Sequence, residues 1–209
     1  MSPRAPAAGS PNVKSPRKGP PRLDKAKVAR ATVQFLARGG QGVIVPGGLI
    51  VTAAHVITWD GEGSMALGDH YFEDVRVAGR KIRAEVYAAE PVSDIAVLGA
   101  PDDEGPLAEA FEACIESIKP VPICTADFDL REPFPVFILA HTGAWIEAQA
   151  SQCRANAPCL AIKVPGGIEG GTSGGPVVTA DGRLLGVVSN SGGADGASEH
   201  FGQIPRLHL

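Results

Sequence analysis

Short runs of apolar residues alternate with turn-forming residues along most of the chain, and this pattern predicts β-strands. Gly39-Gly40, Pro46-Gly47-Gly48 and Asp181-Gly182 separate neighbouring runs as hairpin turns do. The predicted strands are Ala31–Ala37, Gly42–Val45, Leu49–Ala53, Phe72–Val77, Lys81–Ala88, Ile95–Gly99, Pro135–Ala140, Ala144–Gln152, Cys159–Val164, Pro176–Thr179 and Leu184–Ser189.

The period of the pattern changes between residues 104 and 118. Leu107, Phe111, Cys114 and Ile118 recur at helical spacing, while glutamates occupy another face. We expect this helix to connect two halves of the chain and to lie between them. The fold class that accounts for these elements is all-β, with two six-stranded antiparallel barrels.

Composition and charge divide the chain into a tail and a body. Residues 1–30 contain eight Lys or Arg and one Asp, whereas residues 31–209 contain 11 basic and 22 acidic residues. Residues 1–27 are rich in proline and poor in large apolar side chains, so we expect a disordered basic tail. A tail that grips nucleic acid or a membrane surface is the alternative to a solubilising extension. The acidic body is not expected to bind nucleic acid.

Neither a secretory signal nor an apolar run long enough to span a membrane is recognisable, so a cytoplasmic location is expected. The four cysteines form no C-x-x-C pair and have no histidine at ligand spacing. We therefore expect no metal and no cofactor. Cys153 and Cys159 flank a predicted hairpin turn and could meet across it, but reduced thiols fit a cytosolic chain better.

The segment Gly167–Val178 places Ser173 among five glycines, a composition that weakens regular structure. A flexible turn is one explanation. The other is a site where backbone N–H groups converge on a reacting atom. The G-x-S-x-G pattern at 171–175 also occurs in α/β-hydrolases, but there a helix follows the serine and a histidine comes later. Here a strand and a hairpin turn follow, and the later histidines stand near the chain end.

Two upstream segments supply partners that a serine nucleophile needs. His55 ends the run Val51-Thr52-Ala53-Ala54, and Asp94 begins the run Ile95–Leu98. Alone, the first is typical of a core histidine and the second of a turn residue. Together with Ser173 they stand in the order His, Asp, Ser, in which a base activates the hydroxyl and a carboxylate orients the base.

These motifs, T-A-A-H at 52–55, S-D-I-A-V-L at 93–98 and G-T-S-G-G-P-V at 171–177, resemble those of the chymotrypsin-like (trypsin-type) serine peptidases. The resemblance covers about residues 30–205 and is closest to the bacterial high-temperature-requirement (Deg-type) branch, without its peptide-binding domain. It implies a peptidase domain over 28–209, with an amino-terminal barrel over 28–103, a linker helix over 104–118 and a carboxy-terminal barrel over 119–209. The active site would lie in the cleft between the barrels.

The resemblance also assigns roles to residues. His55 would be the base, Asp94 the orienting acid and Ser173 the nucleophile. The oxyanion hole would use the N–H groups of Gly171 and Ser173, and Ser189 would support the acid. The expected substrate-binding residues are Gly167, Ile168, Glu169, Ser189, Asn190 and Ser191. We expect Ser173 Oγ and His55 Nε2 to lie within or near hydrogen-bond reach.

The sequence departs from the family pattern in two informative places. Thr172 stands where many secreted members have the Asp that receives a new amino terminus, so activation by that ion pair is not expected. Gly167 stands where trypsin-like specificity places an acid, so cleavage after small or medium apolar residues is expected. Protein or peptide substrates follow from this interpretation. A non-catalytic binding module and an esterase-type acyl hydrolase remain as alternatives.

Overall fold

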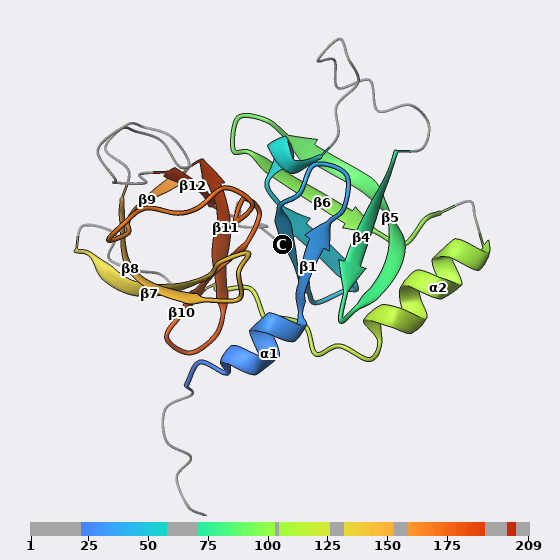
Figure 1. Ribbon diagram of the computed structural model, residues 1–209, viewed down its shortest axis with the longest axis horizontal. Helices are drawn as coiled ribbons and strands as arrows, with labels where there is room; N and C mark the ends of the chain where they lie inside the picture. Colours follow the sequence, from blue (N-terminus) through green and yellow to red (C-terminus); the bar gives the residue numbers. More distant parts are fainter. Residues whose placement is uncertain are drawn as a thin grey trace, which may run out of the picture.

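The computed structural model describes residues 22–57, 71–102, 105–125, 132–152, 159–190 and 200–203. Its strands form two closed six-stranded barrels that lie side by side (Figure 1). The first contains β1 (Thr32–Phe35), β2 (Gln41–Val45), β3 (Leu49–Thr52), β4 (Phe72–Val77), β5 (Arg80–Glu90) and β6 (Ile95–Gly99). The second contains β7 (Phe134–Leu139), β8 (Trp145–Gln152), β9 (Cys159–Lys163), β10 (Pro176–Thr179), β11 (Leu184–Asn190) and β12 (His200–Gln203).

Every paired strand in both barrels is antiparallel. The order is β1-β2-β3-β6-β5-β4 in the first barrel and β10-β11-β12-β9-β8-β7 in the second. The predicted all-β double-barrel fold is therefore confirmed. Eleven of the twelve strands coincide with predicted runs, and β12 was missed because its four residues include one glycine and only one large apolar side chain.

The two barrels share apolar packing. Val178, Leu184 and Val187 of the second barrel belong to the same buried cluster as the core of the first. All five residues of β2 and all four of β10 are buried, since these two strands face each other between the barrels. The segment between the barrels also joins them: Val121 N–H donates to Ile44 O, and Cys124 N–H to Leu184 O.

The connecting helix α2 (Gly105–Ile115) is shorter than predicted, and its predicted place between the barrels is wrong. It packs against β5 on the side of the first barrel that faces away from the second (Figure 1). Phe111, Cys114 and Ile115 supply its buried face, so the apolar stripe that identified the helix covers one barrel only.

The expectation of a disordered tail through residue 27 is wrong at its carboxy-terminal end. Helix α1 (Lys25–Arg30) begins inside that segment, and Asp24 caps it by accepting a hydrogen bond from Lys27 N. Its Val28 is 1% exposed and belongs to the core. Val28, together with Leu23 before the helix and Ala31 after it, packs against the core, and the basic composition obscured this short apolar pattern. Residues 1–21 lie outside the described residues.

No helix in the described part of the chain has the length and apolar character that a membrane crossing requires.

Candidate active site

His55 and Asp94 meet because adjacent strands of the first barrel end beside each other. Thr52 at the end of β3 pairs with Ala96 near the start of β6. The 3₁₀ turn η1 (Ala54–Val56) then carries His55. Asp94 Oδ2 lies 2.7 Å from His55 Nδ1, and Asp94 Oδ1 accepts a hydrogen bond of 2.9 Å from His55 N. The carboxylate therefore orients both the ring and the backbone of the histidine.

A tight turn aims Asp94 at the histidine. The carboxylate of Glu90 accepts hydrogen bonds from the N–H groups of Val92 and Ser93. Asp94 itself has a φ of 53°, in the left-handed region that Asp tolerates better than most residues. Its carbonyl oxygen accepts a hydrogen bond from Ala54 N–H, so both the side chain and the backbone of Asp94 bind to η1.

The second barrel contributes a further donor to the same carboxylate. Ser189 Oγ on β11 donates to Asp94 Oδ2 over 2.5 Å. Partial burial of Asp94 raises its pKa, but the hydrogen bonds from His55 and Ser189 lower it by more. The pKa therefore lies below its ordinary value, and Asp94 is ionised at neutral pH. The side chain of His55 is 47% exposed, so its ring is accessible from solvent.

Ser173 lies on a loop that joins β9 to β10 and is fastened between the barrels. Its carbonyl oxygen accepts a hydrogen bond of 2.7 Å from Gln41 N on β2. On the other side, Gly174 N–H donates to Val188 O on β11, and Val188 N–H donates to Gly175 O. Ser173 thus stands between β2 of the first barrel and β11 of the second.

Glycine is required beside Ser173 because the barrels approach so closely. A Cβ at Gly174 would lie 2.0 Å from Gln41 O and 2.2 Å from Thr52 Oγ1. A Cβ at Gly175 would lie 2.7 Å from Gln41 Oε1. Gly171 and Gly174 also have φ of 90° and 75°. These contacts argue against the first explanation of the glycine-rich segment, because a close-packed loop is not a flexible surface turn.

The N–H groups next to Ser173 differ in whether they have an acceptor. Within the described part of the chain, those of Thr172, Gly174 and Gly175 donate to backbone oxygens, whereas those of Gly171 and Ser173 donate to none. A free N–H pair beside a serine is the arrangement that an oxyanion hole needs. Among the same residues, no hydrogen bond joins Ser173 Oγ to the His55 ring. Such bonds commonly tighten only when substrate binds.

A Cβ placed at Gly40 would lie 2.9 Å from the Val56 side chain and 3.1 Å from Ser173 O. Gly40 therefore lies close to both the loop of Ser173 and the turn of His55, and these two segments are near each other. An activated serine needs a base in this neighbourhood, and the base needs a carboxylate on its far nitrogen. The three groups have the chemistry for acyl transfer.

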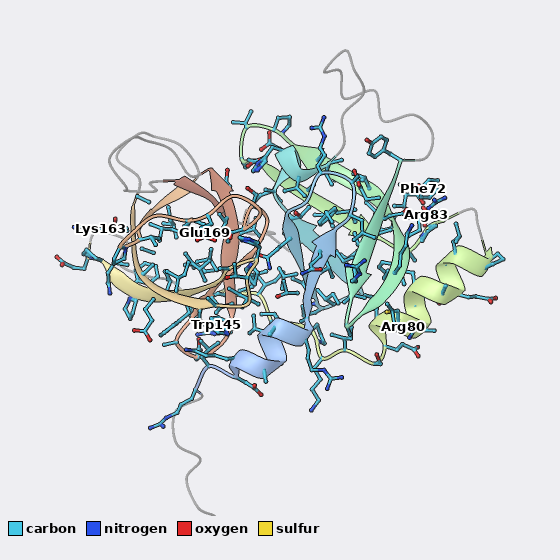
Figure 2. The ribbon with its side chains drawn as sticks, viewed as in Figure 1. Phe72, Arg80, Arg83, Trp145, Lys163 and Glu169 are labelled. Atoms are coloured by element: carbon cyan, nitrogen blue, oxygen red, sulfur yellow. The ribbon has the colours of Figure 1, made fainter. Side chains whose placement is uncertain are left out.

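The remaining predicted residues lie along the second barrel. Gly167, Ile168 and Glu169 follow β9, and Ile168 packs against the core of that barrel. Glu169 is exposed on the second barrel (Figure 2). Ser189 and Asn190 end β11, where Asn190 pairs with His200. Ser191 lies outside the described residues.

His141 contacts this loop, and the sequence analysis did not select it. Its backbone N and its Nδ1 each lie 3.3 Å from Thr172 Oγ1, and Thr172 is fully buried. A Cβ at Gly171 would lie 3.3 Å from the His141 ring. In the sequence, His141-Thr142-Gly143 follows an apolar strand, and this is an ordinary turn pattern that does not indicate a site. The contacts between His141 and Thr172 therefore attach the Ser173 loop to the turn after β7.

The described ranges contain no group of three or more His, Cys, Asp or Glu side chains placed to hold an ion. Cys114 and Cys124 are free thiols, and Cys153 lies outside the described residues.

The model of the trypsin-like peptidase domain matches residues 40–187. A serine protease of a human pathogenic astrovirus is similar in structure, with 22% identity, a TM-score of 0.56 and coverage of 90% of this chain and 97% of that one. The Mycobacterium tuberculosis protease Rv3671c is similar in its inactive form, with 20% identity, a TM-score of 0.55 and 86% of each chain covered. Its active form gives 18% identity and a TM-score of 0.55, covering 95% of this chain and 90% of that one. A search of curated protein sequences found no significant match.

Proposed function

The chain belongs to the trypsin-like peptidase domain family, and from this premise we propose that it is a serine endopeptidase acting through His55, Asp94 and Ser173. The observation that carries the proposal is the 2.7 Å contact between Asp94 Oδ2 and His55 Nδ1, which leaves Nε2 of the ring available as a base. The substrates would be proteins or peptides.

The reaction would proceed by acyl transfer. Ser173 Oγ attacks the carbonyl carbon of the scissile bond while His55 Nε2 takes the hydroxyl proton. The N–H groups of Gly171 and Ser173, which are free of other acceptors in the described chain, stabilise the negative oxygen of the tetrahedral intermediate. His55 then protonates the leaving amine, and water releases the acyl group by the reverse sequence. Asp94 stabilises the imidazolium throughout.

Labelling with a fluorophosphonate probe, followed by peptide mapping, tests this function without knowledge of the substrate. We expect covalent labelling at Ser173, and its loss in Ser173→Ala. Ser117→Ala changes an exposed serine two residues after α2 and should label as the wild type does. Absence of labelling in the wild type would contradict the proposal and favour a non-catalytic binding module. Labelling together with cleavage of esters but of no peptide would favour an esterase.

The preference for a small or medium apolar residue before the scissile bond belongs to the same proposal. Gly167 supplies no charge for a buried Lys or Arg, and an unpaired buried charge costs several kcal/mol. Ile168 supplies apolar surface. Cleavage of a peptide library should favour Ala, Val or Leu at this position. Dominant cleavage after Arg or Lys would contradict the assignment and implicate Glu169. The resemblance to the Deg-type branch stays a prediction.

A further inference from the structure

A cavity of about 270 Å³ with both apolar and polar lining residues lies between the two barrels next to the loop of Ser173. The first barrel lines it with Thr32, Gln34, Gln41 and Arg76, and the turn after β7 lines it with His141 and Gly143. Two contacts join this cavity to the candidate active site: Gln41 N donates to Ser173 O, and His141 contacts Thr172 Oγ1.

Three of the polar residues form a row across neighbouring strands. Gln34 on β1 is directly opposite Gln41 on β2 and directly opposite Arg76 on β4. Directly opposed residues in antiparallel strands point to the same face of the sheet. The row therefore leads outward from Ser173, and since adjacent strands lie about 5 Å apart, the backbone of Arg76 is roughly 10 Å from that of Gln41.

The inner end of the row contains an unused acceptor. Gln41 is 4% exposed, and its Oε1 has no hydrogen-bond partner among the described residues. This oxygen is shielded from solvent on the side of Gly175, where an added Cβ would lie 2.7 Å from it. Gln41 therefore packs against the Ser173 loop and closes the inner end of the row.

The outer end of the row contains an unpaired cation. Lys81, directly opposite Arg76 on β5, lies 2.8 Å from Asp74, which also binds Arg83. Arg76 is exposed, and in the described chain it has no carboxylate partner. The described residues that line the cavity include no Asp or Glu. The charge of the cavity is therefore positive.

The position of Ser173 indicates which part of a substrate would enter. β11, whose end carries the substrate-binding residues that the family resemblance assigns to the acyl part of the substrate, lies on one side of the loop, and Gln41 lies on the other. A chain that crosses Ser173 from β11 therefore passes over Gln41 with its leaving-group part. An extended chain advances about 3.3 Å per residue, so its second or third residue after the scissile bond reaches Arg76.

We propose that this cavity is a specificity site for the leaving-group side of the substrate, in which Arg76 binds an Asp or Glu side chain two or three residues after the scissile bond. The inference rests on the proposed peptidase function and assigns it a substrate class: peptides that are acidic after the cleavage point. The exposed Gln34 would hold the intervening backbone, and His141 would close the cavity from the second barrel.

Quenched fluorescent peptides test this site. The acyl side is kept constant, and the second and third residues after the scissile bond are Glu, Gln, Ala or Lys. We expect kcat/KM to be three- to fivefold higher for Glu than for Gln, the size that a partly exposed ion pair gives, and the ratio to shrink as salt is added. In Arg76→Gln the ratio should fall to one, and in Arg76→Glu the preference should turn to Lys.

Arg80→Gln is the matched control. Arg80 is directly opposite Val77 and so points to the other face of the sheet from Arg76, and Figure 2 shows it on the side of the barrel towards α2. This variant should keep the Glu-to-Gln ratio of the wild type. Peptide cleavage with equal rates for Glu and Gln, or a ratio that Arg76→Gln leaves unchanged, would overturn the specificity site while the peptidase function stands.

Measurements of peptide binding test the specificity site even if the proposed peptidase function fails. Ser173→Ala protein is titrated with the fluorescent Glu and Gln peptides, and anisotropy gives their Kd values. Tighter binding of the Glu peptide, lost when Arg76→Gln is added, supports the site even if the wild type cleaves nothing. Equal Kd values for the two peptides overturn it.

Discussion

Asp94 holds His55 at two points, since its Oδ1 accepts from the histidine backbone N–H and its Oδ2 from the ring Nδ1. The two bonds fix the backbone turn and the ring tautomer together. The ring cannot rotate without breaking one bond, and the turn cannot shift without breaking the other. The carboxylate thus links the fold of the first barrel to the proposed chemistry.

Asp94→Asn should reduce kcat on a small ester by roughly 10⁴-fold, because an amide in this position favours the wrong tautomer of the base. Asn is the appropriate substitution, since it tolerates the φ of 53° that Ala would not. Stopped-flow or steady-state kinetics measures the effect. Asp74→Asn, which changes an acid on the outer face of β4, should keep kcat within about twofold. A similar loss in both variants would contradict a specific role for Asp94.

The stability of the protein should depend on Asp94 at acid pH. Hydrogen bonds from His55 and Ser189 outweigh burial and lower the pKa of this carboxyl below its ordinary value of 3.8. The unfolded state therefore takes up the proton first, so the stabilisation is fully present above pH 3.8 and is lost as the pH falls through the lower folded-state pKa. Urea unfolding between pH 6 and 3 should show that the free energy of unfolding declines less steeply in Asp94→Asn than in the wild type. An equal decline in the two proteins would contradict this role of Asp94.

Ser189→Ala should lower kcat about fivefold, which corresponds to about 1 kcal/mol in the activation free energy. The serine shares Asp94 Oδ2 with His55 Nδ1, so its loss leaves the carboxylate with one donor fewer from the second barrel. Ser151→Ala on β8 removes a hydroxyl from the same barrel away from Asp94 and serves as the control. If both variants have the kcat of the wild type, Ser189 is not part of the catalytic machinery.

The strands were predictable from the sequence because each is a local pattern of apolar residues between turns. The pattern failed at β12, which has too few apolar residues to signal a strand, and at α1, where Val28 stands alone among charged neighbours. In both cases pairing or packing with distant residues stabilises an element that its own sequence barely specifies.

The candidate site likewise contains residues that local motifs indicate and contacts that only the folded structure shows. His55, Asp94 and Ser173 were identifiable because they stand in recognisable local motifs. The contacts of Gly174 with Gln41 and Thr52, and of His141 with Thr172, join residues far apart in the chain. The glycines were expected to aim N–H groups at a point. Their further role, letting one barrel approach the other, depends on three-dimensional packing that no short segment encodes.

Helix α1 should contribute to stability, in contrast to the residues before it. Val28 is buried, and its carbonyl oxygen accepts from Thr32 Oγ1. Val28→Ala should cost about 2 kcal/mol and lower Tm by about 4–8 °C. Arg30→Ala, at an exposed position of the same helix, should change Tm little. Deleting residues 1–21 should also leave Tm unchanged. A large fall in Tm on that deletion would show that the tail is part of the fold.

Gly174→Ala should separate the barrels locally and abolish activity. The added methyl group would lie 2.0 Å from Gln41 O and 2.2 Å from Thr52 Oγ1, and Thr52 Oγ1 itself donates to Gln41 O. Neither atom can retreat without breaking that bond or moving β2, so the cost should exceed about 3 kcal/mol. Gly48→Ala is the control, since its φ of 72° imposes the same backbone strain with open space around the methyl group, and about 1 kcal/mol is expected. Fluorophosphonate labelling and thermal unfolding measure both effects. Equal losses of stability, with Ser173 still labelled in Gly174→Ala, would mean that strain at positive φ, and not contact between the barrels, requires this glycine.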